Sequence, residues 1–459
     1  MKPFTVEDQL LANSKKIHMI GIGGSGMFPL AQILHSKGYL LTGSDNNESD
    51  ILAKVRKLGI PVTLGHRAEN IGDAQLVVYS AAIQADNPER AEAQRRGIPT
   101  LERSFLLGYV TRQFDSVIGV CGTHGKTTVT SMITQILHQD GQDPSAVIGG
   151  YLKAIEGYGR AGSTEHLVCE SCEYNDTFLK LSPDTCLLLN IDRDHLEYFK
   201  TVENLKASFR KFAEKSSVII CNGDDENTMD ALSEIDKPII TFGWEKNNDY
   251  SPDNIIIRTG VFCEFDLLHR GVKILHISLR VPGRHNILNA VAAAAAALHA
   301  GARKESVMKG LSDFSGAGRR FEILAEKNGV TIADDYAHHP AELTVTLNTA
   351  MKMGFKRVWA VFQPFTFSRT KMLLEEFAQA LSIPDRVVMS SIMGSREYNT
   401  YGISTQDLAD RIPGSVWFET FEEIADFVIK NAQAGDLIIT LGCGDIYKAA
   451  RMMINKLDQ

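Results

Sequence analysis

The segment Gly122-Thr123-His124-Gly125-Lys126-Thr127-Thr128 lies between an apolar run, Val117–Val120, and a helix-like stretch that ends near His138. A glycine-rich turn between a strand and a helix is the setting of a phosphate-binding loop. Its glycines let the backbone approach a triphosphate, whose charge then faces the amide N–H groups of the helix N-terminus. In such a loop Lys126 contacts the β- and γ-phosphates, and the Thr127 hydroxyl is a ligand of Mg²⁺. The segment therefore predicts an ATP site, although its G-x-x-G-K-T spacing is shorter than the strict pattern.

A second glycine-rich turn, Gly21–Gly26, follows the apolar run Ile17–Ile20 and matches G-x-G-x-x-G. Asp45 stands where an acid that binds a ribose diol is expected. The pattern selects a diphosphate at a helix N-terminus and a diol beside a carboxylate, and both NAD and UDP offer these groups. Alone it would favour an oxidoreductase. A dehydrogenase needs no second phosphate loop, however, so the two loops together favour a ligase that acts on a UDP-sugar.

The alternation of an apolar strand, a glycine turn and a helix occurs three times, which predicts parallel α/β sheets. The third unit contains strands near Val330–Ala333, Val358–Phe362, Arg386–Ser390 and Leu437–Leu441. A chain of 459 residues is too long for one core. We predict domain boundaries near residue 110 and near residue 317, where Ser315–Gly318 could form a hinge.

The composition is that of an ordinary globular protein with a formal net charge of −8 and no run of Lys or Arg. This argues against nucleic acid or an anionic membrane as the main partner. Seven scattered cysteines suit reduced thiols better than a disulfide framework. No stretch has the ~18–20 apolar residues that span a bilayer, and the first residues lack the apolar core of a signal peptide. We expect a cytoplasmic protein.

Two polar segments follow strands of the central region. Cys169–Tyr174 contains Glu173, and Asn190–His195 ends with a histidine. Because strand ends line the ligand crevice of parallel sheets, Glu173 and His195 are candidate Mg²⁺ ligands near the phosphates. Surface solvation or helix capping is the alternative for either side chain alone.

Further candidates lie toward the C-terminus. Asp334–Pro340 places two acids and two histidines after a strand, which is poor core material. Such a group could bind a cation, position an amine or accept a proton. Arg369 follows another strand and could hold a carboxylate bidentately. The segment that ends at Asn289 is compatible with a helix cap, and the pair Arg319-Arg320 with a solvated basic pair.

Taken together, the motifs resemble those of the Mur ligase family. They are IGIGGSGM, SDNNESD, YSAAI..DNPE, GTHGKTT, E-x-C-E-Y, NID-x-DHLEY, PGRHNILNA, RRFE, DDYAHHP, FQP….SRT and GCGDIYK, in family order over nearly the whole chain. The glycine-rich N-terminus resembles the members that join L-alanine to UDP-N-acetylmuramate with ATP. The resemblance implies an ATP- and Mg²⁺-dependent ligase of peptidoglycan synthesis that binds small molecules, as a monomer or a homodimer. A member that attaches a recycled tripeptide is the near alternative, and a nucleotide-switched binding protein is a more remote one.

The resemblance implies three domains: a UDP-substrate-binding Rossmann-like domain over residues 1–110, a central P-loop ATPase-type domain with a mostly parallel sheet over 111–317, and a C-terminal Rossmann-like domain for amino acid and nucleotide over 318–459. It also assigns roles to matching positions. It implies Lys126 on the phosphates, with Thr127, Glu173 and His195 around Mg²⁺. The remaining expected ATP contacts are Gly122, Thr123, His124, Gly125, Thr128, Asn289 and Arg320. The expected UDP-substrate contacts are Gly23, Gly24, Ser25, Gly26, Asp45, His66 and Ser80. His338 and Arg369 are expected near the incoming amino acid and, with Lys126 and His195, form the expected catalytic set.

Two departures from the family pattern stand out. Cys172 occupies a position where the family often has an acid, and Phe365-Thr366 replace a histidine or a His-Arg pair. The second change removes polar groups near the expected amino-acid site. The predicted chemistry is activation of the sugar carboxylate as an acyl phosphate, followed by attack of an amine.

Overall fold

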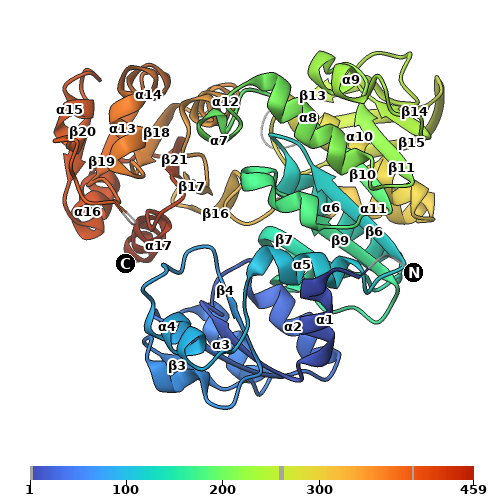
Figure 1. The fold of residues 1–459 in the computed structure, drawn as a ribbon. Coiled ribbons are helices and arrows are strands. Elements are labelled where there is room, and N and C mark those ends of the chain that lie inside the picture. The colour runs from blue at the N-terminus through green and yellow to red at the C-terminus, as the bar shows by residue number, and fades with distance from the viewer. Residues whose placement is uncertain (1–3, 258–262, 395–396, 459) are drawn as a thin grey trace. The chain divides into compact units, whose positions relative to one another are not determined.

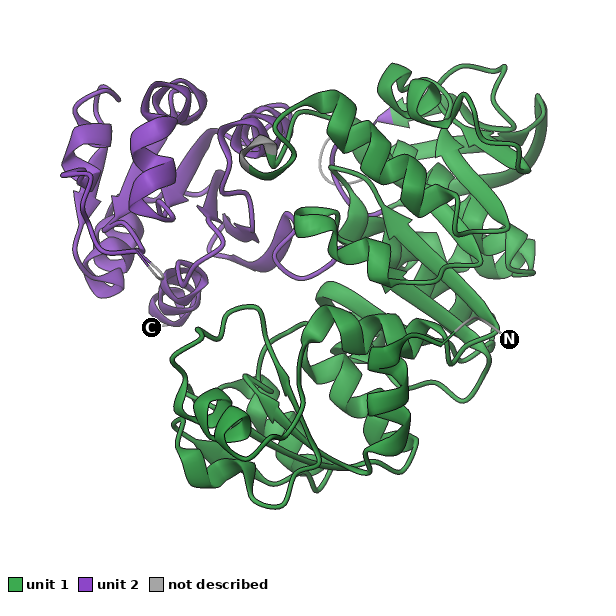
Figure 2. Ribbon diagram, viewed as in Figure 1, with its two compact units in different colours: residues 1–256, 264–279, 284–314 green, residues 257–263, 280–283, 315–459 purple. Residues whose placement is uncertain are grey.

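The computed structural model describes residues 4–257, 263–394 and 397–458. They form three α/β regions, each with a sheet of its own and helices packed on that sheet (Figure 1). The sheets are mostly parallel, as the three strand–turn–helix units predicted. The chain divides into two compact units, with the first two sheets in unit 1 and the third sheet in unit 2 (Figure 2). Unit 2 contains Ser315–Gln459 together with two short preceding segments. The predicted domain boundaries at 110 and 317 stay predictions.

The first sheet has five parallel strands in the order β3-β2-β1-β4-β5. The strands are β1 (Lys16–Ile20), β2 (Leu40–Asp45), β3 (Val62–Leu64), β4 (Leu76–Tyr79) and β5 (Thr100–Glu102). Its helices are α1 (Val6–Asn13), α2 (Phe28–Ser36), α3 (Asp50–Lys57), η1 (Ala68–Ile71), α4 (Pro88–Arg95) and α5 (Arg103–Thr111). Gly21 leaves β1 with a φ of +77°, a conformation that favours glycine, and the turn then leads into α2.

The second sheet has ten strands in the order β15-β14-β13-β12-β11-β10-β6-β9-β7-β8. They are β6 (Ser116–Cys121), β7 (Ser145–Leu152), β8 (Gly157–Arg160), β9 (His166–Glu170), β10 (Thr185–Leu188), β11 (Val218–Asn222), β12 (Ile239–Phe242), β13 (Tyr250–Ile257), β14 (Cys263–His269) and β15 (Val272–Leu279). The central strand β6 pairs in parallel with β9 and β10. The accompanying helices are α6 (Lys126–Gln139), η2 (Lys153–Ile155), η3 (Tyr174–Lys180), α7 (Leu196–Phe199), α8 (Val202–Ala213), α9 (Glu226–Leu232), α10 (Arg284–His299) and α11 (Lys304–Ser312).

The third sheet has six strands in the order β16-β17-β21-β18-β19-β20, and only β16 runs antiparallel to its neighbour. They are β16 (Glu322–Lys327), β17 (Val330–Asp335), β18 (Arg357–Phe362), β19 (Arg386–Ser390), β20 (Val416–Phe418) and β21 (Asp436–Leu441). The helices are α12 (Pro340–Met351), α13 (Phe367–Met372), α14 (Leu374–Leu381), α15 (Thr405–Ala409), α16 (Phe421–Asn431) and α17 (Tyr447–Leu457).

Within unit 1 the first two sheets share one apolar core. Buried side chains of α2 and α5 belong to the same cluster as those of β6, β9 and β10. Helix α5 packs on η3, and α2 packs on β7 and β8. The carboxyl ends of the first and second sheets therefore bound a common space.

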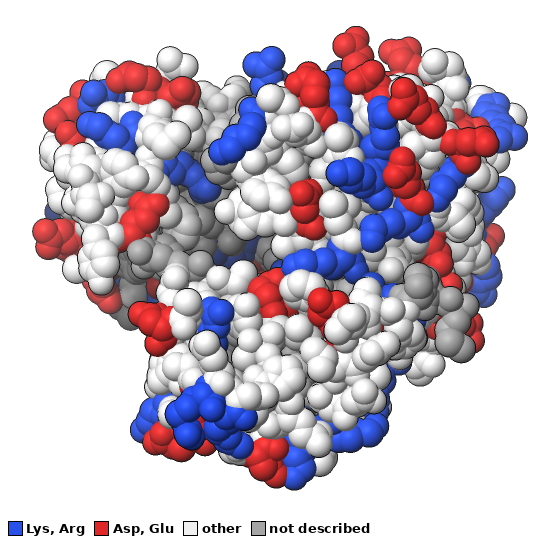
Figure 3. All heavy atoms as spheres, in the orientation of Figure 1, with Lys and Arg blue, Asp and Glu red and all other residues white. Residues whose placement is uncertain are grey.

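The surface carries both signs of charge. Figure 3 shows Lys and Arg interspersed with Asp and Glu over the face that it draws, without a large field of one sign. Among the described residues, the helices are all too short or too polar to cross a membrane.

Candidate active site

The phosphate loop joins β6 to α6, as its sequence predicted. Gly122 and Gly125 have φ values of +129° and +87°, so both occupy backbone conformations that other residues rarely adopt. Gly125 is the N-cap of α6 and Lys126 its first residue. A side chain at Gly122 would meet the backbone of Asn190 at 3.0 Å. The loop therefore presents backbone N–H groups at a helix N-terminus, an arrangement that binds phosphate.

Lys126 points back over this loop. Its Nζ donates to the carbonyl oxygens of Gly122 at 2.6 Å and Thr123 at 3.1 Å, and lies 3.0 Å from the buried Glu173 carboxylate. Burial alone would lower the pKa of Lys126, but the nearby negative charge, above all that of Glu173, outweighs it and raises the pKa. The ammonium group thus stays charged where a phosphate would lie.

Thr127 and Thr128 begin the same helix. The Thr127 hydroxyl donates to Glu170 Oε1 at 3.0 Å, and the other oxygen of Glu170 accepts the Gly149 N–H at 2.7 Å. Thr128 is half-buried in the first helical turn. Glu170 was not singled out from the sequence, although it begins the segment that ends with Glu173 and Tyr174.

Three side chains form a candidate cation site. The ligand atoms of Glu173, Asp194 and His195 all lie within 4.8 Å of one another. Glu173 is buried, and the Lys126 Nζ lies 3.0 Å from each of its carboxylate oxygens. Two carboxylates and an imidazole suit a divalent cation, and the oxygens suit Mg²⁺. The pairing of Glu173 with His195 was predicted, whereas Asp194 was missed, although it directly precedes His195.

The hydroxyl of Thr127, the third expected metal ligand, donates to Glu170, and its role at the metal stays a prediction. Two other expected ATP contacts do lie at the loop. The position of a side chain at Gly125 would be 2.8 Å from Asn289 Oδ1. His124 is exposed, and its Nε2 lies 3.3 Å from Asp192 Oδ2.

Asp45, the last residue of β2, lies against the first glycine-rich turn. Asp45 Oδ2 accepts the Gly23 N–H at 3.0 Å, and a side chain at Gly23 would meet that oxygen at 2.9 Å. The carboxylate therefore lies directly against the turn, beside the place where a diol would be bound.

A cavity of about 300 Å³ in unit 1 lies beside the first glycine-rich turn. One wall is formed by Gly24–Met27, Ser80 and Arg103, and the other by Val147–Gly149, Glu170 and Cys172. The second wall adjoins the phosphate loop through the bond between Glu170 and Thr127. Cys172, which replaces a family acid, thus faces this space, and burial raises the pKa of its thiol. A molecule in this cavity could touch the first turn at one end and approach the phosphate loop at the other.

Arg103 is the residue in this cavity that the sequence analysis missed. Within the described part of the chain its guanidinium makes no hydrogen bond and no ion pair, and its Nη1 would lie 3.2 Å from a side chain at Gly26. An arginine without a partner, beside the N-terminus of α2, is suited to bind an anion. The sequence gives little signal, because Arg103 lies at the start of α5, far from either motif.

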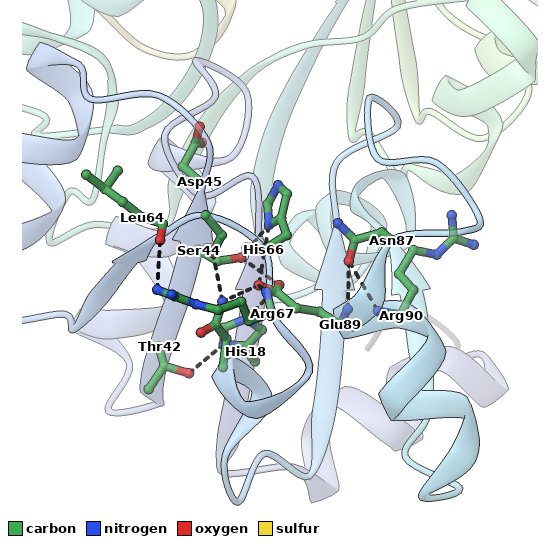
Figure 4. A network of polar contacts seen from close by, with 12 residues as sticks. His18, Thr42, Ser44, Asp45, Leu64, His66, Arg67, Asn87, Glu89 and Arg90 are labelled. Atoms are coloured by element: carbon green, nitrogen blue, oxygen red, sulfur yellow. Dashed lines mark hydrogen bonds and ion pairs between the residues drawn. The ribbon is translucent and has the colours of Figure 1, made fainter.

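The side chain of His66 is largely buried. Figure 4 shows it above a buried carboxylate, that of Glu89, with Ser44 between them. His66 Nδ1 lies 3.2 Å from Ser44 Oγ and 3.4 Å from Glu89 Oε1. His66 and Asp45 thus lie at the ends of neighbouring strands, β3 and β2, at the same edge of the first sheet.

A second group of predicted residues gathers in unit 2, where Asp335 is buried at the end of β17. Asp335 accepts N–H groups from Phe321 at 2.7 Å and Ala337 at 2.8 Å. Burial raises the pKa of Asp335 to about 6, against the opposing effect of Arg320. Asp334, by contrast, forms an ion pair with Arg319 at 2.8 Å and is structural.

His338 and Arg369 lie in the same unit. Burial lowers the pKa of His338, although the Glu342 charge opposes this, so its imidazole is neutral at pH 7. His338 Nδ1 lies 3.0 Å from the Tyr336 carbonyl oxygen, while His339 caps α12. Arg369 Nη1 is buried and has no hydrogen-bond partner among the described residues. Arg369 is therefore suited to hold a carboxylate, and neutral His338 to accept a proton.

The predicted residues thus form two sets. Unit 1 contains the phosphate loop, the cation group, Asn289 and the first glycine turn with Asp45, His66 and Ser80, and unit 2 contains Arg320, His338 and Arg369. In addition, Arg103, Glu170, Asp194 and Glu89 were not found from the sequence.

Three family models match successive parts of the chain. They are the Mur ligase family catalytic domain over residues 16–115, the Mur ligase middle domain over 120–297 and the Mur ligase glutamate ligase domain over 319–444. The fold, the two glycine-rich turns and these matches agree: the chain belongs to the Mur ligase family.

Individual proteins of similar sequence or structure add detail to the family assignment. The chain is 43% identical over 449 residues to the UDP-N-acetylmuramate–L-alanine ligase of Acetivibrio thermocellus, covering 96% of each chain. It is 42% identical to the protein of the same name from Agathobacter rectalis, covering 96% of this chain and 98% of that one. The crystal structure of UDP-N-acetylmuramate–alanine ligase from Thermotoga maritima matches with a TM-score of 0.83 and 28% identity, over 96% of this chain and 99% of that one. A murein peptide ligase from Psychrobacter arcticus shares the fold with a TM-score of 0.75 at 24% identity.

We expect Arg103→Met to weaken binding of UDP at least about tenfold, because a charge-assisted contact to an anion is lost. Binding of uridine, which has no phosphate, should not change. Calorimetric titration of both ligands measures the two affinities. Arg95→Met is the matched control, since Arg95 is exposed and pairs with Glu92. Equal losses for UDP and uridine would contradict a role in phosphate binding.

The raised pKa of Asp335 predicts a pH dependence of stability in unit 2. Folding favours the protonated carboxyl, so its contribution is complete below the unfolded pKa near 3.8 and is lost as the pH rises through about 6. Relative to Asp335→Asn, the wild-type protein should therefore lose up to about 3 kcal/mol of unfolding free energy over this window. Denaturant titration followed by the fluorescence of Trp359 and Trp417, both in unit 2, measures it. A pH-independent difference between the two proteins would contradict the shift.

Proposed function

We propose that this protein joins L-alanine to the carboxylate of UDP-N-acetylmuramate, with ATP converted to ADP and phosphate. The observation that carries the proposal is the cavity between the first glycine-rich turn and Glu170, a residue that is hydrogen-bonded to Thr127 of the phosphate loop. One wall contains the glycine-rich turn and Arg103, suited to a diphosphate, and the other adjoins the phosphate loop. This arrangement fits a UDP-linked acid whose carboxylate extends toward ATP. The names of the relatives at 42–43% identity support the same substrates.

The reaction needs an activated acid, because a carboxylate has a poor leaving group. The γ-phosphoryl group of ATP passes to the sugar carboxylate and gives an acyl phosphate. Phosphoryl transfer depends mainly on positioning and charge neutralisation, which the charged Lys126 and the N-terminus of α6 provide. Mg²⁺ held by Glu173, Asp194 and His195 would supply further neutralisation of phosphate charge.

The second step is attack of the α-amino group of alanine on the acyl carbon. The C–N bond forms, a tetrahedral intermediate collapses, and phosphate leaves. Arg369 Nη1 would hold the carboxylate of alanine, and neutral His338 would accept a proton from the amine.

Lys126→Ala should abolish phosphate release, because the charge at the β- and γ-phosphates is lost, while UDP binding survives. A coupled phosphate assay and calorimetry with UDP measure the two properties. Lys211→Ala, an exposed lysine on α8, serves as the control for loss of a positive charge. Turnover of the Lys126 variant within about tenfold of the wild type would refute the phosphate-loop assignment.

The acceptor is tested by phosphate release from ATP, Mg²⁺ and UDP-N-acetylmuramate with single amino acids added in turn. We expect release that requires the UDP-sugar and is fastest with L-alanine. His338→Asn should lower kcat/KM for alanine at least about tenfold and leave the KM of ATP unchanged. Release with a tripeptide but with no single amino acid would assign the chain to recycling instead.

A further inference from the structure

The ligands of the candidate cation site come from two separate segments of the chain. Glu173 belongs to residues 171–176, which follow β9, and His195 belongs to residues 190–198, which follow β10. We call these the ligand segments. Strand β6 lies between β9 and β10 in the sheet, so the two strands are not direct neighbours. Strand pairing alone therefore does not set the distance between the two ligands, and contacts between the ligand segments must do so.

The backbone of both ligand segments is strained. Asn175 and Asp176 have φ values of 53° and 56°, and His195 itself has a φ of 54°. Residues other than glycine rarely adopt this left-handed conformation, and they keep it only where surrounding contacts hold it. The turn at Asn175 and Asp176 brings the Asp176 N–H to the Glu173 carbonyl oxygen at 2.9 Å. Contacts that maintain these conformations therefore also determine the geometry of the cation site.

The carboxylate of Asp176 links the two ligand segments. Its Oδ2 accepts the Tyr198 hydroxyl at 2.9 Å, and its Oδ1 accepts the hydroxyl of Ser208 on α8. The Tyr198 N–H in turn donates to the His195 carbonyl oxygen at 2.9 Å. The hydrogen bond to Asp176 also raises the pKa of Tyr198, so the phenol remains the donor at neutral pH. A continuous series of hydrogen bonds thus joins the backbones of the two cation ligands through Asp176 and Tyr198.

An aromatic contact joins the same two ligand segments. The ring of Tyr174 lies 4.8 Å from the imidazole of His195, centroid to centroid, at an interplanar angle of 55°. The rings of Tyr174 and Tyr198 are 6.5 Å apart. Because Tyr174 directly follows Glu173 in the chain, this contact places the imidazole beside the segment that supplies the carboxylate. The hydrogen bonds set the spacing of the segments, and the ring contact limits the rotation of the imidazole.

We propose that Asp176 and Tyr198 are positioning residues that hold the two ligand segments at the separation that a divalent cation needs. Ligands that are in place before the ion arrives lose little conformational freedom on binding, so the ion binds more tightly. Tyr198 is 40% exposed, so loss of its hydroxyl removes little from the core, and its effect is expected at the ligands. The inference rests on the cation site of the proposed function and adds what gives that site its affinity.

Binding of Mn²⁺ to the full chain, followed by the electron paramagnetic resonance signal of the free ion, tests the proposal. The relevant site is the one that Glu173→Gln abolishes. Tyr198→Phe removes the hydroxyl and keeps the ring, and it should weaken this site at least about tenfold, as is typical when a group that orients metal ligands is lost. Tyr39→Phe is the matched control, because it removes a buried hydroxyl that is bonded to Tyr109 at 2.8 Å in the core of unit 1. The control should bind Mn²⁺ as the wild-type protein does.

A second measurement separates positioning of the cation ligands from a general disturbance of the site. Calorimetric titration with ADP gives one affinity in Mg²⁺ and another in EDTA. Tyr198→Phe should lower the affinity in Mg²⁺ and keep that in EDTA within about twofold of the wild type, because the phosphate loop itself is unchanged. Equal losses under both conditions would mean that the variant disturbs the whole site, and would overturn the proposal.

The outcomes distinguish this inference from the function on which it rests. If the wild-type protein has no Mn²⁺ site that depends on Glu173, the cation site itself is refuted and the proposal with it. If the wild-type protein has this site and Tyr198→Phe binds Mn²⁺ equally well, the positioning role alone is refuted and the proposed ligase reaction is unaffected.

Discussion

Parallel pairing of β6 with β9 and β10 is the constraint on which the reaction site in unit 1 depends. The register places Val120 opposite Glu170 and Cys121 opposite Leu188, so the three strands end at the same edge. The phosphate loop, the Glu170–Glu173 segment and the Asn190–His195 segment therefore emerge side by side. Residues about 50 to 70 positions apart meet there because neighbouring parallel strands end together.

Electrostatic interactions determine which side chains at this edge of the second sheet are ionised. Lys126 and Glu173 are largely buried, and their opposite charges stabilise each other where either alone would be costly. Glu173 also belongs to the candidate cation site with Asp194 and His195. In unit 2, Asp335 and His338 have pKa values moved toward neutral forms by burial. Glu89 shows the opposite outcome, because enough donors surround it to keep it ionised.

The sequence predicted the features that rest on local patterns. The two glycine-rich turns, the strands before them and the helices after them are local, and all were found within a few residues. Asp194 and Glu170 were missed although each lies in a polar strand-end segment, because only contacts across the sheet reveal which of several acids face the loop. Arg103 and Glu89 have no local signal. Arg103 stands out because its guanidinium lines a cavity without a partner among the described residues, and Glu89 because donors from separate segments of the chain surround its carboxylate. Neither feature follows from a short sequence motif. Short strands such as β3, β5 and β20 were also missed, since three residues are too few to show a pattern.

The central claim is that the sugar carboxylate is activated by phosphorylation before the amine attacks. Transfer of a labelled oxygen from the carboxylate to phosphate tests this claim directly. UDP-N-acetylmuramate labelled with oxygen-18 in its carboxylate is turned over with ATP, Mg²⁺ and L-alanine, and the released phosphate is analysed by mass spectrometry. An acyl phosphate transfers one carboxylate oxygen to each phosphate, so we expect one labelled oxygen per phosphate released. Phosphate free of label would mean that ATP is hydrolysed by water and would contradict the account.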